Sequence, residues 1–448
     1  MDDTPHRHAG GRALDRKILN LAWPALGALV AEPLFVLIDS AVVGRLGTNQ
    51  LAGLTLASTL LVTAVAIFVF LAYATTGAVA RQLGAGNLRK ALSVGMDGVW
   101  LALALGALTM TVGLLSAPWV INAMGAEEAI VPYAVDYLRY SLPGIPGMLV
   151  VLAATGVLRG LQDTRTPFVV AVAGAIVNTI GSITLVYGAG MGIAGSGLAT
   201  SLTQIGMGVA LLVVVLRGAR GHGVSWRPEL SGILVNARAG LPLLIRTLTL
   251  RLAILVTVAV ATHLGAVTLA AHQIVNAMWG LTAFALDALA IAAQALIGHG
   301  LGGRDVAGVR RITRRCLQWG TAAGAVMGVI IAATGWLITP LFNSDPQVQR
   351  AAAVALVVTG LLLPIAGWVF VLDGVLIGAG DGRYLAWAGV ITLVAYLPLA
   401  GLVWRFAPEG PAGLAWLWVS FAGGFMLARA ITTGLRARGT RWMVLGAD

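Results

Sequence analysis

The stretch that decides the fold is LAWPALGALVAEPLFVLIDSAVVGRL, residues 21–46. It is long enough to cross a membrane as a helix, since about 20 apolar residues span the hydrocarbon core. It also contains two carboxylates, Glu32 and Asp39, and two helix-breaking prolines, Pro24 and Pro33. Acidic side chains are costly at membrane depth and are kept mainly in a bundle interior or along a water-filled path. The stretch therefore predicts a membrane-spanning helix with charge in its interior.

The two acids are seven residues apart and share one helical face. Pro33 removes a backbone hydrogen bond between them, which favours a bend. Such a helix is typical of a machine driven by protons or ions. The alternative interpretation is a pair of acids neutralised by a neighbouring arginine.

Composition points to a membrane protein. The 448 residues are 58% hydrophobic and 10% charged, with a mean hydropathy of +0.89. These values argue against a disordered chain and against a soluble enzyme. The single cysteine, Cys316, excludes an internal disulfide framework, and neither of the two lysines follows a glycine, so a P-loop is absent. Because residues 1–17 are polar and lack a signal-peptide pattern, we expect the first span to remain as an anchor.

Twelve apolar runs of spanning length follow one another, separated by Gly, Pro or charged residues. Continuous runs indicate helices, because barrel strands would alternate over about 10 residues. In the ninth run, Gly320, Gly324 and Gly328 form a small-residue stripe that predicts close helix packing. The fold class is therefore predicted to be an all-α integral membrane protein with twelve transmembrane helices.

An internal repeat with an offset of 218 residues divides these helices into two sets of six. Pro24 recurs as Pro242, and the block GVLRGLQDTR at 156–165 recurs as GVLIGAGDGR at 374–383. Parallel repeats of this kind are common in secondary transporters. The predicted domains are listed in chain order: an N-terminal tail 1–17, an N-lobe 18–216, a linker 217–233, a C-lobe 234–435 and a C-terminal tail 436–448.

Basic residues predict the orientation. On one side of the membrane we place 23 of the 29 Lys and Arg residues, in the tails and the even-numbered loops, and we count Arg429 with those of the C-terminal tail. The positive-inside rule then places both termini and the linker in the cytoplasm. The same distribution explains the net charge of +11 through topology and contact with anionic lipids, so we expect no nucleic-acid partner.

Charged and polar residues inside the spans are the candidate site. Asp39 has no basic residue at membrane depth in its own span, and its repeat equivalent is Thr257. Asn178 lies in the middle of the fifth span. In the C-lobe, Arg246 and Arg251 are candidates to hold Asp287 or Asp373, in a structural or a functional role. His272, early in the eighth span, is a second-rank candidate, because a buried histidine is more often a core residue than a ligand.

These residues lie in motifs that resemble multidrug and toxic compound extrusion (MATE) transporters of the DNA-damage-inducible, or DinF-like, branch. The resemblance covers nearly the whole chain. The motifs are WPALGALVAEPLFVLIDSAVVGRLG at 23–47, TTGAVARQLGAGN at 75–87, AATGVLRGLQDTRTP at 153–167, AAHQI at 270–274, LDALAIAAQALIGHGLG at 286–302 and LDGVLIGAGD at 372–381.

The resemblance implies two six-helix lobes around a V-shaped cavity, alternating access, and export driven by inward proton or sodium flow. It implies that Asp39 is the cation-site aspartate, Pro24 the bending proline and Asn178 the fifth-helix asparagine. Asp373 matches a tenth-helix aspartate of the family. One departure concerns Ser182, since many relatives have an aspartate at that position.

The predicted function is secondary active efflux in a bacterial cell membrane, by a monomer that needs no cofactor or resident metal. We expect small organic substrates, cationic or amphipathic, and coupling to H⁺ at Asp39, with Glu32 as a relay. Ser182 and Asn178 are neutral where a sodium site is helped by a second carboxylate, although Na⁺ bound at Asp39 and Asn178 stays open. A flippase for lipid-linked precursors is the alternative function, and an intramembrane enzyme lacks its Asp-rich or His/Glu motifs.

Overall fold

The computed structural model describes residues 4–447, apart from the side chains of residues 4–10 and of Glu32. Within that range, twelve helical segments are long and apolar enough to cross a membrane. The predicted all-α fold class is confirmed. The helices of the first half are α1 (Thr4–Gly44), α2 (Thr48–Phe68), α3 (Phe70–Gly84), α4 (Leu88–Ala123), α5 (Val131–Ser141), α6 (Ile145–Gly160), α7 (Arg165–Ile183) and α8 (Ile193–Gly221). The second half contains α9 (Leu230–His263), α10 (Ala266–Gly302), α11 (Val306–Phe342), α12 (Pro346–Gly378), α13 (Gly382–Phe406), α14 (Pro411–Trp418) and α15 (Met426–Arg438).

Several spans change helix type or break along their length. The span made of α2 and α3 is interrupted at Val69, and α5 continues into α6 through a 3₁₀ turn, Leu142–Gly144, that contains a proline. Proline lacks the amide hydrogen that an α-helix needs at this point. Two π-helical segments, η2 (Thr184–Gly188) and η3 (Val419–Phe425), continue α7 and α14. By contrast, α1 continues through Pro24 and Pro33 without interruption, so the predicted bending stays a prediction.

The two halves share their helix boundaries at the predicted offset. Adding 218 to the bounds of the α2–α3 span, Thr48–Gly84, gives those of α10, Ala266–Gly302. The turns agree too, because the equivalent residues Gln162 and Gly380 both adopt left-handed backbone angles, with φ of 64° and 74°. The internal repeat is therefore present in the structure.

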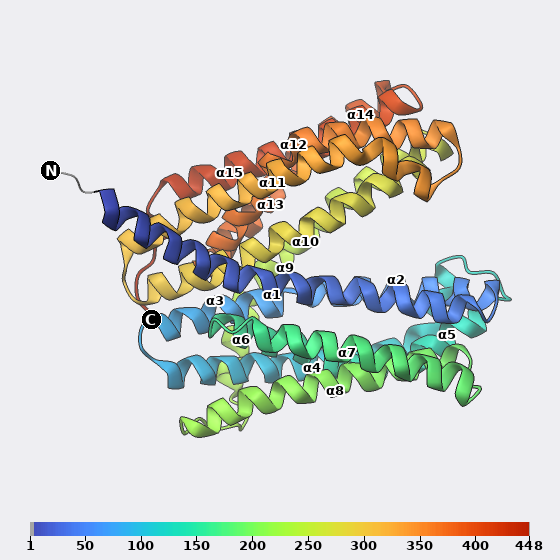
Figure 1. Ribbon diagram of the computed structural model, residues 1–448. Helices are drawn as coiled ribbons and strands as arrows, with labels where there is room; N and C mark the ends of the chain where they lie inside the picture. The colour runs from blue at the N-terminus through green and yellow to red at the C-terminus, as the bar shows by residue number, and fades with distance from the viewer. Residues whose placement is uncertain (1–3, 448) are drawn as a thin grey trace. The chain divides into compact units, whose positions relative to one another are not determined.

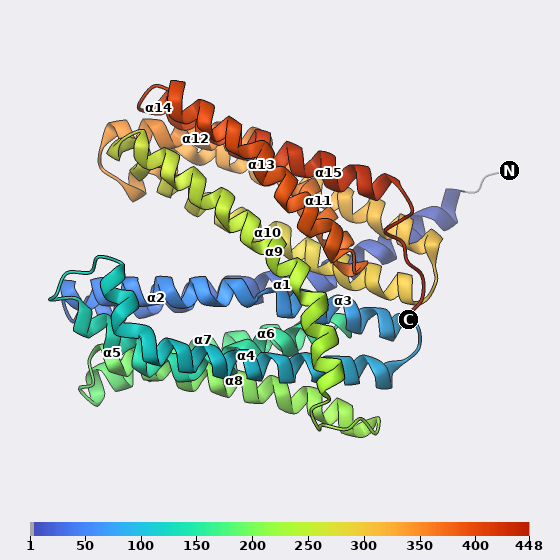
Figure 2. The same cartoon turned by 180° about the vertical axis from the view of Figure 1, so that it is seen from behind.

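The chain packs as two compact units. One unit is Trp23–Gly240, and the other combines residues up to Ala22 with the segment from Leu241 onward. The changeover points lie shortly after the starts of the predicted lobes at residues 18 and 234. Within each unit the helices lie side by side, with α2 to α8 in the first unit and α10 to α15 in the second (Figures 1 and 2).

Ion pairs also tie the second unit together. Arg315 on α11 forms a two-pronged ion pair with Asp15 near the start of α1, and Trp319 donates a further hydrogen bond to Asp15 at 2.8 Å. Arg436 at the end of α15 pairs with Asp381 before α13 at 2.6 Å. Both carboxylates are mostly covered. Paired charges of this kind fix the ends of the helices relative to one another within the unit.

The closest packing in this unit is between α11 and α12, where the glycine stripe has its predicted role. Gly320, Gly324 and Gly328 are buried, and each faces backbone of α12. A methyl group on Gly324 would lie 2.5 Å from the carbonyl oxygen of Leu363. The two backbones therefore approach as closely as glycine allows, which is how membrane helices gain packing without a hydrophobic driving force.

Gly324→Ala is predicted to destabilise the protein, because the new methyl group forces α11 and α12 apart. Overpacking of this kind costs about 1–3 kcal/mol. The matched control is Gly280→Ala in α10, where no atom lies within 4 Å of the added carbon. That change should be neutral or stabilising, since alanine is the better helix former by about 0.5–1 kcal/mol. Thermal unfolding in detergent measures the change in stability of both variants. Equal melting temperatures for the two variants would contradict the packing assignment.

Candidate functional site

Asp39 on α1 lies in a buried cluster of hydroxyl groups from three other helical segments. Its side chain is 4% exposed. Ser182 on α7 donates a hydrogen bond to Asp39 Oδ1 at 2.8 Å. Thr200 on α8 and Tyr137 on α5 donate to Oδ2 at 3.1 and 3.4 Å. Of the sequence-predicted residues, the structure therefore brings Asp39 and Ser182 into direct contact.

Asn178 joins the cluster one step further out. Its amide nitrogen lies 3.4 Å from Thr200 Oγ1, so it contacts Asp39 only through that hydroxyl. Its amide oxygen is buried and makes no hydrogen bond to any described residue. Ser182 and Asn178 are four residues apart on α7, and η2 begins two residues after Ser182. Such π-helical turns within α-helices are frequent at functional sites.

Asp39 has only neutral polar partners in the described part of the chain. No lysine or arginine forms an ion pair with it there. A carboxylate in low dielectric without a cation is costly in its charged form, and hydroxyl donors offset only part of that cost. The sequence-based alternative, an acid neutralised by arginine, therefore does not apply to Asp39. The side chain of Glu32 lies outside the described residues, so its role as relay stays a prediction.

A small cavity of about 70 Å³ borders this cluster within the same unit. Apolar side chains such as Phe35 and Met148 form part of its lining, and the polar residues that line it are Asp39, Ser58, Tyr137, Ser141, Thr200 and Gln204. Among the described residues that line it, the charged one is Asp39. The space is sufficient for a water molecule or a small cation, which needs room and two to four polar partners.

The equivalent cluster in the other half is less polar than the cluster around Asp39. Thr257 replaces Asp39, and its hydroxyl lies 2.7 Å from that of Tyr396, the equivalent of Asn178. Trp418 and Ala400 replace Thr200 and Ser182. Tyr396 and Trp418 belong to a buried aromatic cluster with Trp279, Phe421 and Phe425. Since the same fold forms with an apolar filling, the polar cluster around Asp39 is not required for folding of a repeat.

Asp373, the buried acid of the C-lobe, is instead neutralised by arginine side chains. Asp373 on α12 is 4% exposed and is shared by Arg246 on α9, at 2.5 Å, and Arg429 on α15. Asp287 on α10 interacts electrostatically with Arg429. The expected partnership of Arg246 with Asp373 is therefore present. Arg251 is exposed and forms no ion pair with a described residue, so the structure gives it no part in this cluster.

Arg429 is a correction to the sequence interpretation. Counted from the sequence among the basic residues that flank the spans, it is instead buried and bound to Asp373. Arg429 lies inside the twelfth apolar run, and this position was the sequence signal that could have predicted its burial. His272 is 1% exposed, and its ring lies 5.6 Å from that of Trp418. Both of its ring nitrogens lack a hydrogen-bond partner among the described residues, so it belongs to the aromatic core and not to the Asp373 cluster.

Tyr137 and Thr200 are the residues that sequence reasoning missed in the Asp39 site. Hydroxyl side chains are frequent in membrane helices, where they mostly bond to their own backbone, so neither stands out in the sequence. The repeat was the one signal that could have found Thr200, because its equivalent is the bulky Trp418.

Known proteins resemble this chain along nearly its whole length. DNA damage-inducible protein F of Escherichia coli strain K12 is 29% identical over 377 residues, which cover 82% of this chain and 81% of that protein. A probable multidrug resistance protein NorM of Idiomarina loihiensis is 24% identical over 440 residues, covering 94% and 93% of the two chains. The crystal structure of the Vibrio cholerae MATE transporter VcmN in its bent form shares the fold, with a TM-score of 0.87 at 20% identity over 96% of this chain and 98% of that one.

The profile of the MatE family matches the chain twice, at residues 24–184 and 242–402. These two ranges are separated by the same 218 residues as the repeat, and together they cover more than half of the sequence. The chain belongs to the MatE family of multidrug and toxic compound extrusion transporters.

Proposed function

We propose that this chain exports small organic, cationic or amphipathic compounds from the cell in exchange for protons, with Asp39 as the residue that carries the proton. One observation supports this most strongly. Asp39 is a buried carboxylate held by hydroxyls alone, next to a small cavity, without a basic partner among the described residues. Such a group is neutralised by whatever small cation reaches it, which is what a coupling site requires.

A proton fits this site better than sodium does. One carboxylate is enough for a proton, whereas a dehydrated sodium ion needs several oxygen ligands and is helped by a second negative charge. Ser182 is neutral, and its hydroxyl already donates a hydrogen bond to Asp39. Sodium is nevertheless the second candidate, because the amide oxygen of Asn178, which has no hydrogen-bond partner among the described residues, is a suitable additional ligand.

Protonation would change the contacts of α1. A neutral Asp39 loses about half of its attraction for the hydroxyl donors of Ser182, Thr200 and Tyr137, because hydrogen bonds to a charged group are about twice as strong as neutral ones. That loss would release α1 from α5, α7 and α8. Pro24 and Pro33 would then let the helix bend, since each already lacks a backbone hydrogen bond.

Asp39→Asn is predicted to abolish gradient-driven export while leaving the protein folded and inserted. The amide keeps the shape of the side chain but cannot exchange a proton. The control is Asp136→Asn on the neighbouring helix α5, an intramembrane carboxylate that does not line the cavity. Efflux from proteoliposomes should fall to background in the first variant and persist in the second. Normal efflux by Asp39→Asn would refute the assignment.

Export is predicted to follow an imposed pH gradient, to collapse with a protonophore and to ignore sodium. A panel of organic cations, neutral amphiphiles and a lipid-linked pyrophosphate, tested in proteoliposomes under separate proton and sodium gradients, measures this. Transport that tracks sodium without a pH gradient would instead support the site at Asp39 and Asn178. Movement of the pyrophosphate alone would favour the flippase.

We further propose that the protein is a monomer in the bacterial inner membrane with both termini in the cytoplasm. Its lone cysteine, Cys316, is buried, so single cysteines can be introduced on an unreactive background. Glu127→Cys, in the exposed turn between α4 and α5, should be labelled from outside by an impermeant maleimide. Arg311→Cys, near the start of α11, should be labelled only after the membrane is permeabilised. The opposite pattern would reverse the orientation.

A further inference from the structure

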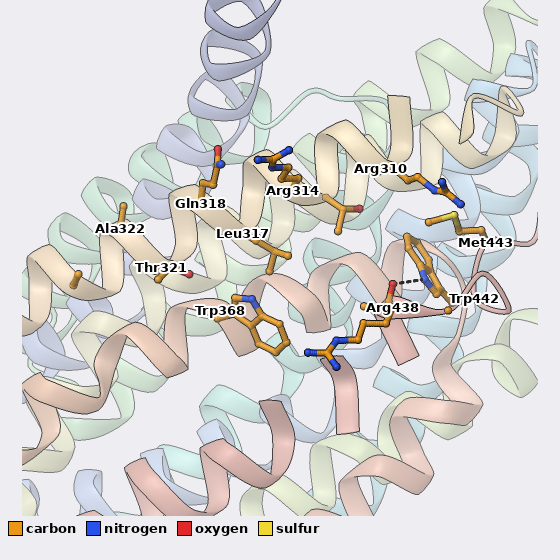
Figure 3. A pocket seen from close by; sticks show the side chains of 14 residues that line it. Arg310, Arg314, Leu317, Gln318, Thr321, Ala322, Trp368, Arg438, Trp442 and Met443 are labelled. Carbon is orange, nitrogen blue, oxygen red and sulfur yellow. Dashed lines mark hydrogen bonds between the residues drawn. The ribbon is translucent and has the colours of Figure 1, made fainter. Parts of the chain in front are cut away.

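A large groove in the second unit runs along α11. It has a volume of about 900 Å³ and runs between α11, Trp368 on α12 and the chain that follows α15. Figure 3 shows Arg310 on α11 pointing toward Met443 and Trp442, and Trp368 between Leu317 and Arg438. Trp442 is 1% exposed, and its indole N–H donates to the carbonyl oxygen of Ala437, so the wall formed by the tail is ordered.

A second groove of about 490 Å³ continues the first one. The two share Thr321, Trp368 and Arg438. The lining of the second groove is otherwise apolar, with residues from α12 and α15. Three of them, Leu427, Ile431 and Leu435, are 50–61% exposed. Exposed apolar side chains along a membrane-spanning helix face lipid, so this groove opens toward acyl chains.

The first groove has a positive mouth. Arg310, Arg314 and Arg438 line it, all three are exposed, and none forms an ion pair with a described residue. The neighbouring Arg315 and Arg436 do not line it and are paired with Asp15 and Asp381. No carboxylate is found among the described residues that line either groove. The arginines that face the groove are thus left for a negative partner from elsewhere.

The positions of these arginines along the helices match a lipid headgroup. Arg310 and Arg314 lie in the first turns of α11, which begins at Val306, and Arg438 ends α15. The charges are therefore at the end of the spans, at the level of the membrane surface, and the apolar groove runs from there toward the membrane interior. Arginine suits phosphate because its planar fork donates two parallel hydrogen bonds. Tryptophan is enriched at this level of the membrane.

We propose that this pair of grooves binds an acidic phospholipid, with its phosphate group between Arg310, Arg314 and Arg438 and an acyl chain in the groove bounded by Trp368, Ile431 and Leu435. A free soluble anion would use the arginines but has no need of the apolar extension. A neutral lipid would use the extension but leave three arginines without a counter-charge. The combination of both features selects a lipid with a negative headgroup.

Native mass spectrometry of the whole, delipidated protein tests this with phosphatidylglycerol and phosphatidylcholine of equal chain length. The protein should prefer phosphatidylglycerol. Each arginine near a membrane surface contributes roughly fivefold to anionic lipid binding. Replacing Arg310, Arg314 and Arg438 together by Gln should therefore weaken phosphatidylglycerol binding on the order of 100-fold. The matched control is Arg311→Gln, an exposed arginine of α11 that lines neither groove.

A second variant tests the apolar part with all the arginines intact. Ile431→Trp, at an exposed position that lines the second groove, should narrow that groove and also weaken phosphatidylglycerol binding. It keeps the proposal testable if the triple variant fails to fold. Inorganic phosphate at millimolar concentration should not displace the lipid. Equal binding of the two lipids, an equal loss in Arg311→Gln, or displacement by phosphate together with normal binding by Ile431→Trp would each overturn the proposal.

Discussion

The cost of a carboxylate inside a membrane-spanning helix is the constraint on which the rest of this structure depends. The hydrocarbon interior offers neither water nor counter-ions, so each such group must be neutralised by protein or by a mobile cation. The chain meets this constraint in two ways. Asp373 is fixed by Arg246 and Arg429, whereas Asp39 is surrounded by hydroxyls that lower the cost without removing it. The first acid is neutralised by two ion pairs, whereas the second has only hydroxyl partners among the described residues.

The repeat makes the difference between these two solutions informative. Both halves use the same helix boundaries, yet the polar cluster of one half is replaced by Thr257, Tyr396 and Trp418 in the other. The ion pair of Asp373 with Arg246 likewise occurs in one half only, because the equivalent residues in the first half are Thr155 and Ala28. The two halves therefore share a scaffold and differ in their internal charges. One half holds its buried acid with hydroxyl groups, and the other holds its buried acid with two arginines.

Sequence reasoning reached the scaffold more readily than the site. Twelve spans and the offset of 218 follow from hydropathy and from recurring Pro and Gly positions, which are local signals. Asp39 and Asn178 stood out because charged and amide side chains are rare at membrane depth, and Ser182 because many members of the family that the chain resembles have an aspartate there. Tyr137 and Thr200 did not, since only tertiary packing shows whether a hydroxyl bonds to its own helix or to a carboxylate. Arg429 was misplaced because its nearness to the chain end suggested a solvated position, whereas Asp373 holds it inside.

The connections between the two packing units have a mechanical consequence. The chain passes from one unit to the other inside α1, at Ala22–Trp23, and inside α9, at Gly240–Leu241. In each case the second residue beyond the boundary is a proline, Pro24 or Pro242. The units are joined by helices and not by flexible loops. A displacement of one unit against the other would therefore twist α1 and α9. The torsion is concentrated where a backbone hydrogen bond is already missing. Asp39 lies on α1, so the helix that carries this carboxylate is covalently continuous with both units.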